Sequence, residues 1–440
     1  MQSPSDYILE EFTIISPKLT EPLVITGLIG ELAIYENLEL PYLTGQVLIR
    51  DDARLYDGIE FNGTEICRIS IKCSIENSKT ITKFFTLQNV ATTTKTSDTV
   101  EILALQLIET NAFHDNAIRV NKCYNGTPDN IIRKILQDHL IIDNDEETNS
   151  ISGISGPAVG PYQSPFKCII PNYTPFQACN WILRKMTTSM GLPYYLYSTL
   201  NGDNLQLRSF EEMLTQDVWN IDTPYRYNTA HAQSEGGNNE AMMFNVINYG
   251  VANKEDVLKL LRSGSIGSQH NITDITSGQQ IKFHHDIDRT LTQLIEANII
   301  NSSEDPIHHS FYRIASNDKI SEMNNLNISK IIGNDTYNGI RNYHEEKDAG
   351  GLNVYAIQNA IQNLMFKSSI NFTVHGLPYL PYSNASIGRK IRFEYTATDQ
   401  FGPHADKKRS GDYVIYSARH LFVDKRHTVD MSAVKLGNPK

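Results

Sequence analysis

Residues 410–434, SGDYVIYSARHLFVDKRHTVDMSAV, predict a long β-hairpin. Apolar side chains alternate from Tyr413 to Phe422 and again from Val429 to Ala433, with a charged turn at residues 424–426 between them. Both faces of the first strand are largely apolar, so it must lie inside a sheet. We expect His420 to be a hydrogen-bonded core residue and not a catalyst, because buried polar groups persist when they are paired.

The composition is that of an ordinary folded protein. The chain has 440 residues, 40% hydrophobic and 20% charged, which is enough for two to four domains. Its 39 basic and 50 acidic residues give a net charge of −11, and no Lys/Arg cluster interrupts that balance. Tight nucleic-acid binding is therefore not expected, because phosphate contacts need concentrated positive charge. The 22 tyrosines favour a protein rich in strands and interfaces.

The cysteines and the N-terminal residues bear on the cellular setting. No C-x-x-C pair occurs among Cys67, Cys73, Cys123, Cys168 and Cys179. Two of them lie on the apolar face of the strand predicted over residues 65–75, so we expect reduced, buried thiols. Residues 1–7 lack a basic segment followed by an apolar one, and no long apolar run occurs later. We expect neither a cleaved signal nor a membrane anchor.

The predicted elements change along the chain. The first 112 residues consist of short alternating strands, typical of an antiparallel barrel or sandwich. The region 113–222 is mixed, with helices near 128–140 and 175–190 and a hairpin over 194–210. Three residues, Thr174, Pro175 and Phe176, begin the second of these helices with a capping box and a core side chain, and we expect Gly191 to end it.

The rest of the chain returns to sheet after an irregular stretch. We predict a strand and a short helix within 223–286, a polar, Asn-rich, irregular insertion over 287–351, and a helix followed by strands over 352–440. The fold class is therefore α+β, mainly β. Gly63 and Gly388 each stand three residues before an isoleucine that opens a strand, but this spacing alone does not establish a repeat.

Residues that could carry chemistry do not form a recognisable catalytic set. The densest group of potential metal ligands is His284, His285, Asp286 and Asp288. Adjacent histidines on a strand point to opposite faces, so a turn or strand end is favoured over a metal site. Glu211 and Glu212 stand at a predicted helix start, where they favour the helix dipole. We predict no catalytic residues, no metal and no cofactor.

Four blocks of sequence together resemble the baseplate hub proteins of contractile-tailed, T-even-like bacteriophages, whose hub fold the type VI secretion spike proteins share. The blocks are residues 36–71, 169–186, 191–210 and 410–434. The positions that we assign to this structural pattern are Gly45, Gly63, Thr174, Pro175, Phe176, Gly388, Gly411, Tyr413 and His420.

The resemblance implies a specific architecture and role. Two similar antiparallel β-barrel domains are expected, one over 1–112 and one over 352–440, with inserted mixed α/β regions, and 223–286 belongs to the second barrel or to the insertion. Three copies would form a ring of six similar units. That homotrimer would adapt the sixfold tail tube protein to a threefold central spike protein, alongside other baseplate proteins.

The same resemblance places the protein in the virion, at the phage tail baseplate, after synthesis in the host cytoplasm. DNA would only pass through the lumen, and we hypothesise that an acidic lumen lets it slide. Two other functions stay open from the sequence. One is a spike-associated component that recognises a glycan or the host surface. The other is a hydrolase, which would depend on Glu211, Glu212 or Asp286.

Overall fold

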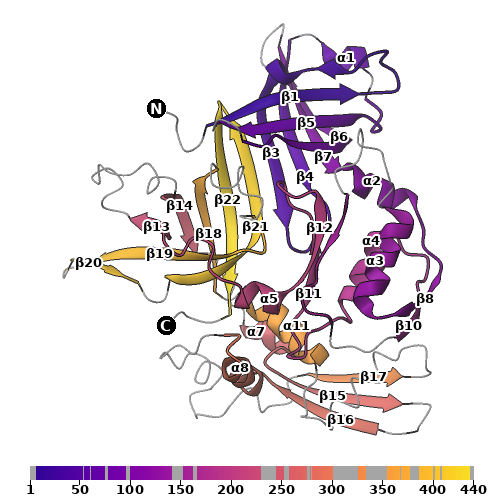
Figure 1. The fold of residues 1–440 in the computed structure, drawn as a ribbon, viewed down its shortest axis with the longest axis vertical. Coiled ribbons are helices and arrows are strands. Elements are labelled where there is room, and N and C mark those ends of the chain that lie inside the picture. The colour runs from indigo at the N-terminus through magenta and orange to yellow at the C-terminus, as the bar shows by residue number, and fades with distance from the viewer. Residues whose placement is uncertain are drawn as a thin grey trace.

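The computed structural model describes residues 6–436 except 53, 60, 75–77, 96–99, 141–151, 162–165, 229–243, 252–256, 275–277, 279, 301–325, 333–353, 367, 377–385, 400–401 and 407–408. The predicted α+β, mainly β class is confirmed, because a fourteen-stranded sheet dominates the molecule. Figure 1 shows this sheet in indigo and yellow, from the two ends of the chain, with the central part of the sequence packed beside and below it.

The first half of the large sheet, here called the first module, comes from the N-terminal region. Its strands are β1 (Tyr7–Ile15), β3 (Ile29–Asn37), β4 (Thr44–Asp51), β5 (Ile66–Cys73), β6 (Ile81–Lys95) and β7 (Glu101–Glu109). They lie in the order β3-β4-β7-β6-β5-β1. Three short elements accompany them, namely β2 (Leu23–Val24), the 3-10 helix η1 (Thr26–Leu28) and α1 (Leu55–Ile59).

The second half, the second module, comes mostly from the C-terminal region. Its strands are β13 (Tyr225–Asn228), β14 (Val246–Val251), β18 (Ser368–His375), β19 (Lys390–Asp399), β21 (Gly411–Val423) and β22 (Arg426–Lys435), with β20 (Gly402–Ala405) beside β19. They lie in the order β14-β18-β22-β21-β19-β13. The predicted hairpin is the β21–β22 pair, and its turn residues Asp424 and Lys425 both have positive φ.

The two modules have the same strand order. In chain order, β1, β3, β4, β5, β6 and β7 of the first module correspond to β13, β14, β18, β19, β21 and β22 of the second. All matched pairs are antiparallel except that β13 runs parallel to β19, whereas β1 runs antiparallel to β5. The two modules therefore share one strand order and differ in the direction of one edge strand.

Two of the bulges in the ladders of the first module fall at places that match bulges in the second module. A bulge at Gly30 in the β3–β4 pair matches one at Ile247 in β14–β18. A bulge at Gln88 in β6–β7 matches one at Tyr416 in β21–β22, and β6 has a second bulge, at Ala91, which β21 lacks. Because a bulge fixes register, counting along the paired residues from these points, with the extra residue Ala91 left out, gives a residue-by-residue correspondence between the modules.

The two modules are joined edge to edge and are not separate closed barrels within the described residues. The outer half of β21 pairs antiparallel with β3, from Ser417 opposite Asn37 to Val423 opposite Glu31. Two isolated bridges lie at the ends of this arrangement. Asp6, just before β1 of the first module, bridges to Arg426 at the tip of the β21–β22 hairpin of the second module, and within the second module Arg226 of β13 bridges to Asn245, just before β14.

A mixed region follows the first module. It contains α2 (Thr110–Ala117), β8 (Cys123–Gly126), α3 (Pro128–His139), β9 (Gly153–Ser155), β10 (Phe166–Ile169), α4 (Pro175–Leu183), β11 (Tyr194–Tyr197), β12 (Asn204–Ser209) and α5 (Phe210–Thr215). The predicted helix over 175–190 is wrong at its end, because α4 stops at Leu183. Thr188 instead bonds across a turn to Leu192, and the positive φ of Gly191 belongs to that turn.

The described residues between β14 and β18 form helices and a three-stranded sheet, and the helices pack into the core of the second module. The described elements are α7 (Val257–Arg262), β15 (Gly267–Asp274), β16 (Gln280–Asp286), α8 (Ile287–Glu296), β17 (Asn327–Ile332) and α11 (Val354–Leu364). The prediction that 287–351 is irregular is wrong in two places. The Asp286 side chain caps α8, which buries Ile287, Leu291 and Leu294, and β17 pairs with β15. Residues 301–325 and 333–350 lie outside the described part.

None of the described helices combines the length and hydrophobicity needed to cross a bilayer. All five cysteines are free thiols, and only Cys123 is exposed. Cys67 and Cys73 lie buried on the inner face of β5, as predicted.

Candidate functional site

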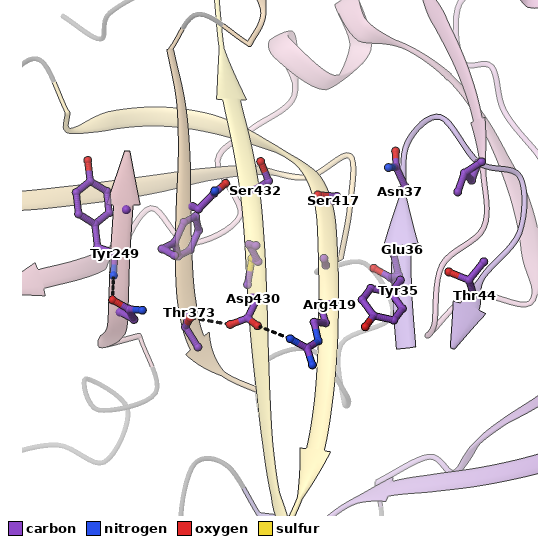
Figure 2. Close-up of a pocket in the computed structure, with 17 residues that line it drawn as sticks. Tyr35, Glu36, Asn37, Thr44, Tyr249, Thr373, Ser417, Arg419, Asp430 and Ser432 are labelled. Carbon is purple, nitrogen blue, oxygen red and sulfur yellow. Dashed lines mark hydrogen bonds and ion pairs between the residues drawn. The ribbon is translucent and has the colours of Figure 1, made fainter. Parts of the chain in front are cut away.

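An open groove crosses the junction of the two modules. Figure 2 shows that its floor is made by β14, β18, β22, β21, β3 and β4, lying side by side. The groove has a volume of about 690 Å³. Its lining is mostly uncharged and polar, including Asn37, Thr44, Thr373, Ser417 and Ser432. Such a surface offers many weak hydrogen-bonding groups and no deep apolar pocket.

The charges in the groove balance one another. Arg419 lies 3.5 Å from Glu31 and 3.8 Å from Asp430, and Asp430 also accepts a 2.6 Å hydrogen bond from the hydroxyl of Thr373 (Figure 2). Because these side chains are partly exposed, each ion pair contributes little stability. Their main effect is to leave this face without excess positive charge.

Directly behind the groove, a buried carboxylate and two histidines connect the modules. Glu36 of β3 lies 3.4 Å from Nε2 of His420 on β21, and Nδ1 of His420 lies 3.1 Å from Nε2 of His427 on β22. All three are almost fully buried. A buried carboxylate needs such partners, so this polar chain favours the β21–β3 register over a slipped one.

His427 has the least polar surroundings of the three. Its ring stacks on Phe422 with a centroid distance of 4.2 Å. Burial, together with the neighbouring His420, holds the pKa of His427 well below its ordinary value, so this ring is neutral at pH 7. With no access to solvent, the pair is suited to structure and not to proton transfer with a substrate.

The tip of the β11–β12 hairpin is inserted into the first module. Leu200 at this tip is buried in the module's core, and its N–H donates to Glu36. The ammonium group of Lys83 donates to the carbonyl of Gly202 in the same tip. Glu109, also fully buried, accepts a 2.9 Å hydrogen bond from the N–H of Leu43.

Lys83 and Glu109 act on each other electrostatically. Burial lowers the pKa of Lys83, and the nearby Glu109 opposes that shift. Burial raises the pKa of Glu109, and Lys83 opposes it in turn. Each charge therefore favours the ionised form of the other, against the larger effect of burial.

The same hairpin touches all three hydrophobic cores of the molecule. Tyr195 and Tyr197 belong to the core of the second module, Tyr194 and Leu196 belong to the core around α3 and α4, and the tip belongs to the first module. Because both faces of β11 are buried, the hairpin fixes the three parts of the fold relative to one another.

The residues assigned to the family pattern lie mostly at the starts of strands or at close contacts between elements. Gly45 lies in β4, where an added Cβ would come 3.3 Å from the carbonyl of Ala33. Gly63 and Gly388 have φ of 86° and 78°, each just before a strand. Tyr413 is buried in the second module and donates to the carbonyl of Arg409, while Gly411 begins β21 with positive φ. Their assignment to a family pattern stays a prediction.

The capping group at the start of α4 has the predicted geometry. The Thr174 hydroxyl accepts from the N–H of Gln177, the Gln177 side chain bonds back to Thr174, and Pro175 is the first helical residue. The N–H of Phe176 donates to Asp115 of α2 at 2.6 Å. This end of α4 is thus tied to the helix that leaves the first module.

The residues considered for metal binding or hydrolysis have structural contacts. His285 is buried and bonds to the carbonyl of Ser265, whereas His284 on the same strand is exposed. Asp286 caps α8, and Glu212 lies 3.8 Å from Arg208. Across the described residues, no three His, Cys, Asp or Glu side chains form a group that could hold a metal ion.

Sequence reasoning missed the buried charges. Glu36, Lys83 and Glu109 each occupy an inward position of an alternating strand, as the sequence LAIYENL around Glu36 shows. The signal in the sequence is a charged residue that stands at the same alternating positions as the buried apolar residues of its strand. The insertion of Leu200 was not foreseeable, because it depends on how a distant hairpin packs.

Comparison with known proteins gives a likeness in fold only. No protein family matches the sequence, and no curated protein sequence does. The tail protein from Neisseria meningitidis MC58 is 10% identical with a TM-score of 0.50, and the match covers 98% of this chain and 97% of that one. The 43 kDa tail protein of prophage MuSo2 from Shewanella oneidensis is 10% identical with a TM-score of 0.50, covering 97% and 98%. The chain thus has a fold found in solved tail proteins.

Proposed function

We propose that this protein is a non-enzymatic, structural hub of a phage-type tail baseplate, where a homotrimeric ring adapts the sixfold tail tube to a threefold central spike. The observation that carries this proposal is the repeated strand order, β3-β4-β7-β6-β5-β1 and β14-β18-β22-β21-β19-β13, within one chain. The fold shared with solved tail proteins supports the same role.

Two similar modules in one chain allow a threefold assembly to match a sixfold one. Three chains with two similar modules each present six similar units around one axis. A closed ring of this kind needs head-to-tail contacts between unlike surfaces, with a rotation that closes. The pairing of β21 with β3 is a head-to-tail contact between modules, already made within one chain.

The groove face is the surface that we assign to the lumen. Its hydroxyl and amide groups, and an Arg419 neutralised by Glu31 and Asp430, offer no concentrated positive charge to phosphates. With the net charge of −11, this face would let DNA pass without holding it. The tail tube protein, the central spike protein and other baseplate proteins would then contact the remaining faces.

The mass of the protein in solution tests the ring. Light scattering is measured on the protein alone and mixed with the central spike protein of the same tail. We expect a species of three chains of 49.7 kDa each, and a six-lobed ring in negative-stain images. A strict monomer under both conditions would overturn the proposal.

A further inference from the structure

The correspondence between the modules matches one edge of β21 with one edge of β6, and within the described residues only the β21 edge pairs with a further strand. In the second module, the outer half of β21 pairs with β22 on one side and with β3 on the other. Its counterpart in the first module, residues 89–95 of β6, pairs with β7 on one side. No described strand pairs with its other side, and six of these seven residues are exposed.

The counterpart of β3 is similarly open. β14 pairs with β18 along one side. On its other side β13 approaches it, with the bridge of Arg226 to Asn245 just before the strand and with Tyr227 against Tyr249 at a centroid distance of 5.4 Å, but no described strand forms a ladder with β14 there. Ile247 and Val251 on this strand are 49% and 52% exposed. Among the described residues, one edge of the β21 type and one edge of the β3 type are therefore not paired in a ladder.

We propose that these two edges pair with each other between neighbouring copies of this chain, so that β6 of one copy receives β14 of the next as an antiparallel strand. This inference rests on the proposed ring and names the contact that would close it. Carrying the β21–β3 register across the ladders places Thr93 opposite Val251, Thr94 opposite Gly250 and Lys95 opposite Tyr249.

The side chains on the two edges suit strand addition. Residues 89–95 are NVATTTK and β14 is VINYGV, which are rich in β-branched residues and contain one charge between them. Exposed edges of this kind attract other strands, and proteins that leave them unpaired protect them with charges or prolines. Here only Lys95 protects either edge, which indicates an edge that is covered in the assembled protein.

A second feature at the end of the β6 edge points to the same neighbour. At the matched place in the second module, the N–H of Leu38, just after β3, donates to the carbonyl of Tyr416, and Leu38 is buried in that core. Around Gln88, the counterpart of Tyr416, the first module instead has an open apolar groove of about 400 Å³. Phe113 on its wall is 42% exposed. The first module thus lacks a contact that the second module receives within the chain.

Cysteine cross-linking tests the register. In a Cys123→Ser background, which removes the one exposed native thiol, Thr93→Cys with Val251→Cys should give disulfide-linked chains under mild oxidation. The matched control is Thr93→Cys with Gly250→Cys, whose side chains would point to opposite faces of the sheet. We expect linked species of two and three chains from the first pair and almost none from the control.

Charge variants at the same two exposed positions give an independent measurement. Thr93→Lys with Val251→Lys places like charges opposite each other, whereas Thr93→Lys with Val251→Glu places opposite charges there. We expect the first variant to associate about tenfold more weakly than the second. Trimers of normal mass without the Thr93–Val251 cross-link would overturn this pairing and leave the proposed ring standing. A monomer under all conditions would overturn both.

Discussion

The two modules reach the same strand order with different interiors. At matched positions of the ladders, Leu32 and Val47 in the first module stand where Tyr249 and Phe372 stand in the second. The second interior is filled by contacting rings, such as Phe372 and Phe393 with centroids 5.3 Å apart. The interior of the first module is mostly aliphatic, and it also contains the inserted hairpin tip, which bonds to the buried Glu36 and Lys83 of this module.

This difference shows that register and bulge positions define the topology more strictly than core composition does. Cores accept other apolar side chains as long as volume and pattern are kept. Unequal interiors also make the modules distinguishable, which a ring of alternating units requires if each copy is to join its neighbour in one way only.

The largest expected effect comes from removing Lys83, the buried cation whose charge acts on the buried Glu109 in the first module. Lys83→Ala would leave Glu109 buried without its cation and the carbonyl of Gly202 without its donor. Breaking a buried pair costs about 3–5 kcal/mol of the free energy of unfolding. Hydrogen exchange read by mass spectrometry should show the loss of protection in β5, β6 and β7, and much less in β19 and β22.

The matched control removes both charges. Lys83→Met together with Glu109→Gln keeps an acceptor for the N–H of Leu43 and should recover most of the lost stability, because an apolar replacement of a whole buried pair is often tolerated. Equal loss of protection in both modules after Lys83→Ala would show that the interiors are not independent.

Part of this comparison could be predicted from the sequence. The alternation around Tyr413 and His420 predicts a buried hairpin, and the cap at Thr174 predicts the start of α4, because both depend on side chains close together in the chain. The spacing of Gly63 and Gly388 carried a real signal of duplication, since both have positive φ just before matched strands.

The rest depends on contacts between distant segments. The pairing of β21 with β3 joins residues almost 400 positions apart, and periodicity shows which face of a strand is buried but not which strand lies beside it. The helix α8 was missed because its apolar stripe, Ile287, Leu291 and Leu294, lies in a polar stretch of low average hydrophobicity. The buried position of Lys83 is likewise set by a hairpin more than 100 residues away.

A smaller effect is expected from the paired glycines. Alanine at Gly63 or at Gly388 would adopt a left-handed backbone conformation at a cost of about 1–2 kcal/mol. At Gly388 the added Cβ would also lie 2.5 Å from the hydroxyl oxygen of Tyr197, whereas at Gly63 the nearest atom is 3.6 Å away. We expect Gly388→Ala to cost about 1–3 kcal/mol more than Gly63→Ala in denaturant unfolding, because of overpacking.

Removing the hydroxyl group of Tyr197 separates the cost of the steric contact at Gly388 from the cost of its left-handed backbone. In a Tyr197→Phe background the excess cost of Gly388→Ala should shrink, and a double-mutant cycle measures by how much. Equal costs for the two glycines in every background would mean that the hairpin does not hold the second module at this point.

The smallest expected effect is a pH dependence of the free energy of unfolding that comes from Lys435. This residue occupies the position in the second module that Glu109 occupies in the first. Burial lowers the pKa of Lys435 to about 8, while its ammonium group lies 4.7 Å over the ring of Tyr413. In the unfolded chain lysine keeps its proton up to about pH 10.4, so between these values the unfolded state binds more protons and stability rises with pH by about 1.4 kcal/mol per unit.

Below pH 8 both states are protonated, and this group adds no pH dependence. Lys435→Met removes the titration, so the free energy of unfolding of the wild type minus that of the variant should be flat up to about pH 8 and then rise. Equilibrium unfolding in urea between pH 7 and pH 10 measures this difference. A difference that stays constant through pH 10 would show that Lys435 reaches solvent, and that the second module does not bury a charge where the first module does.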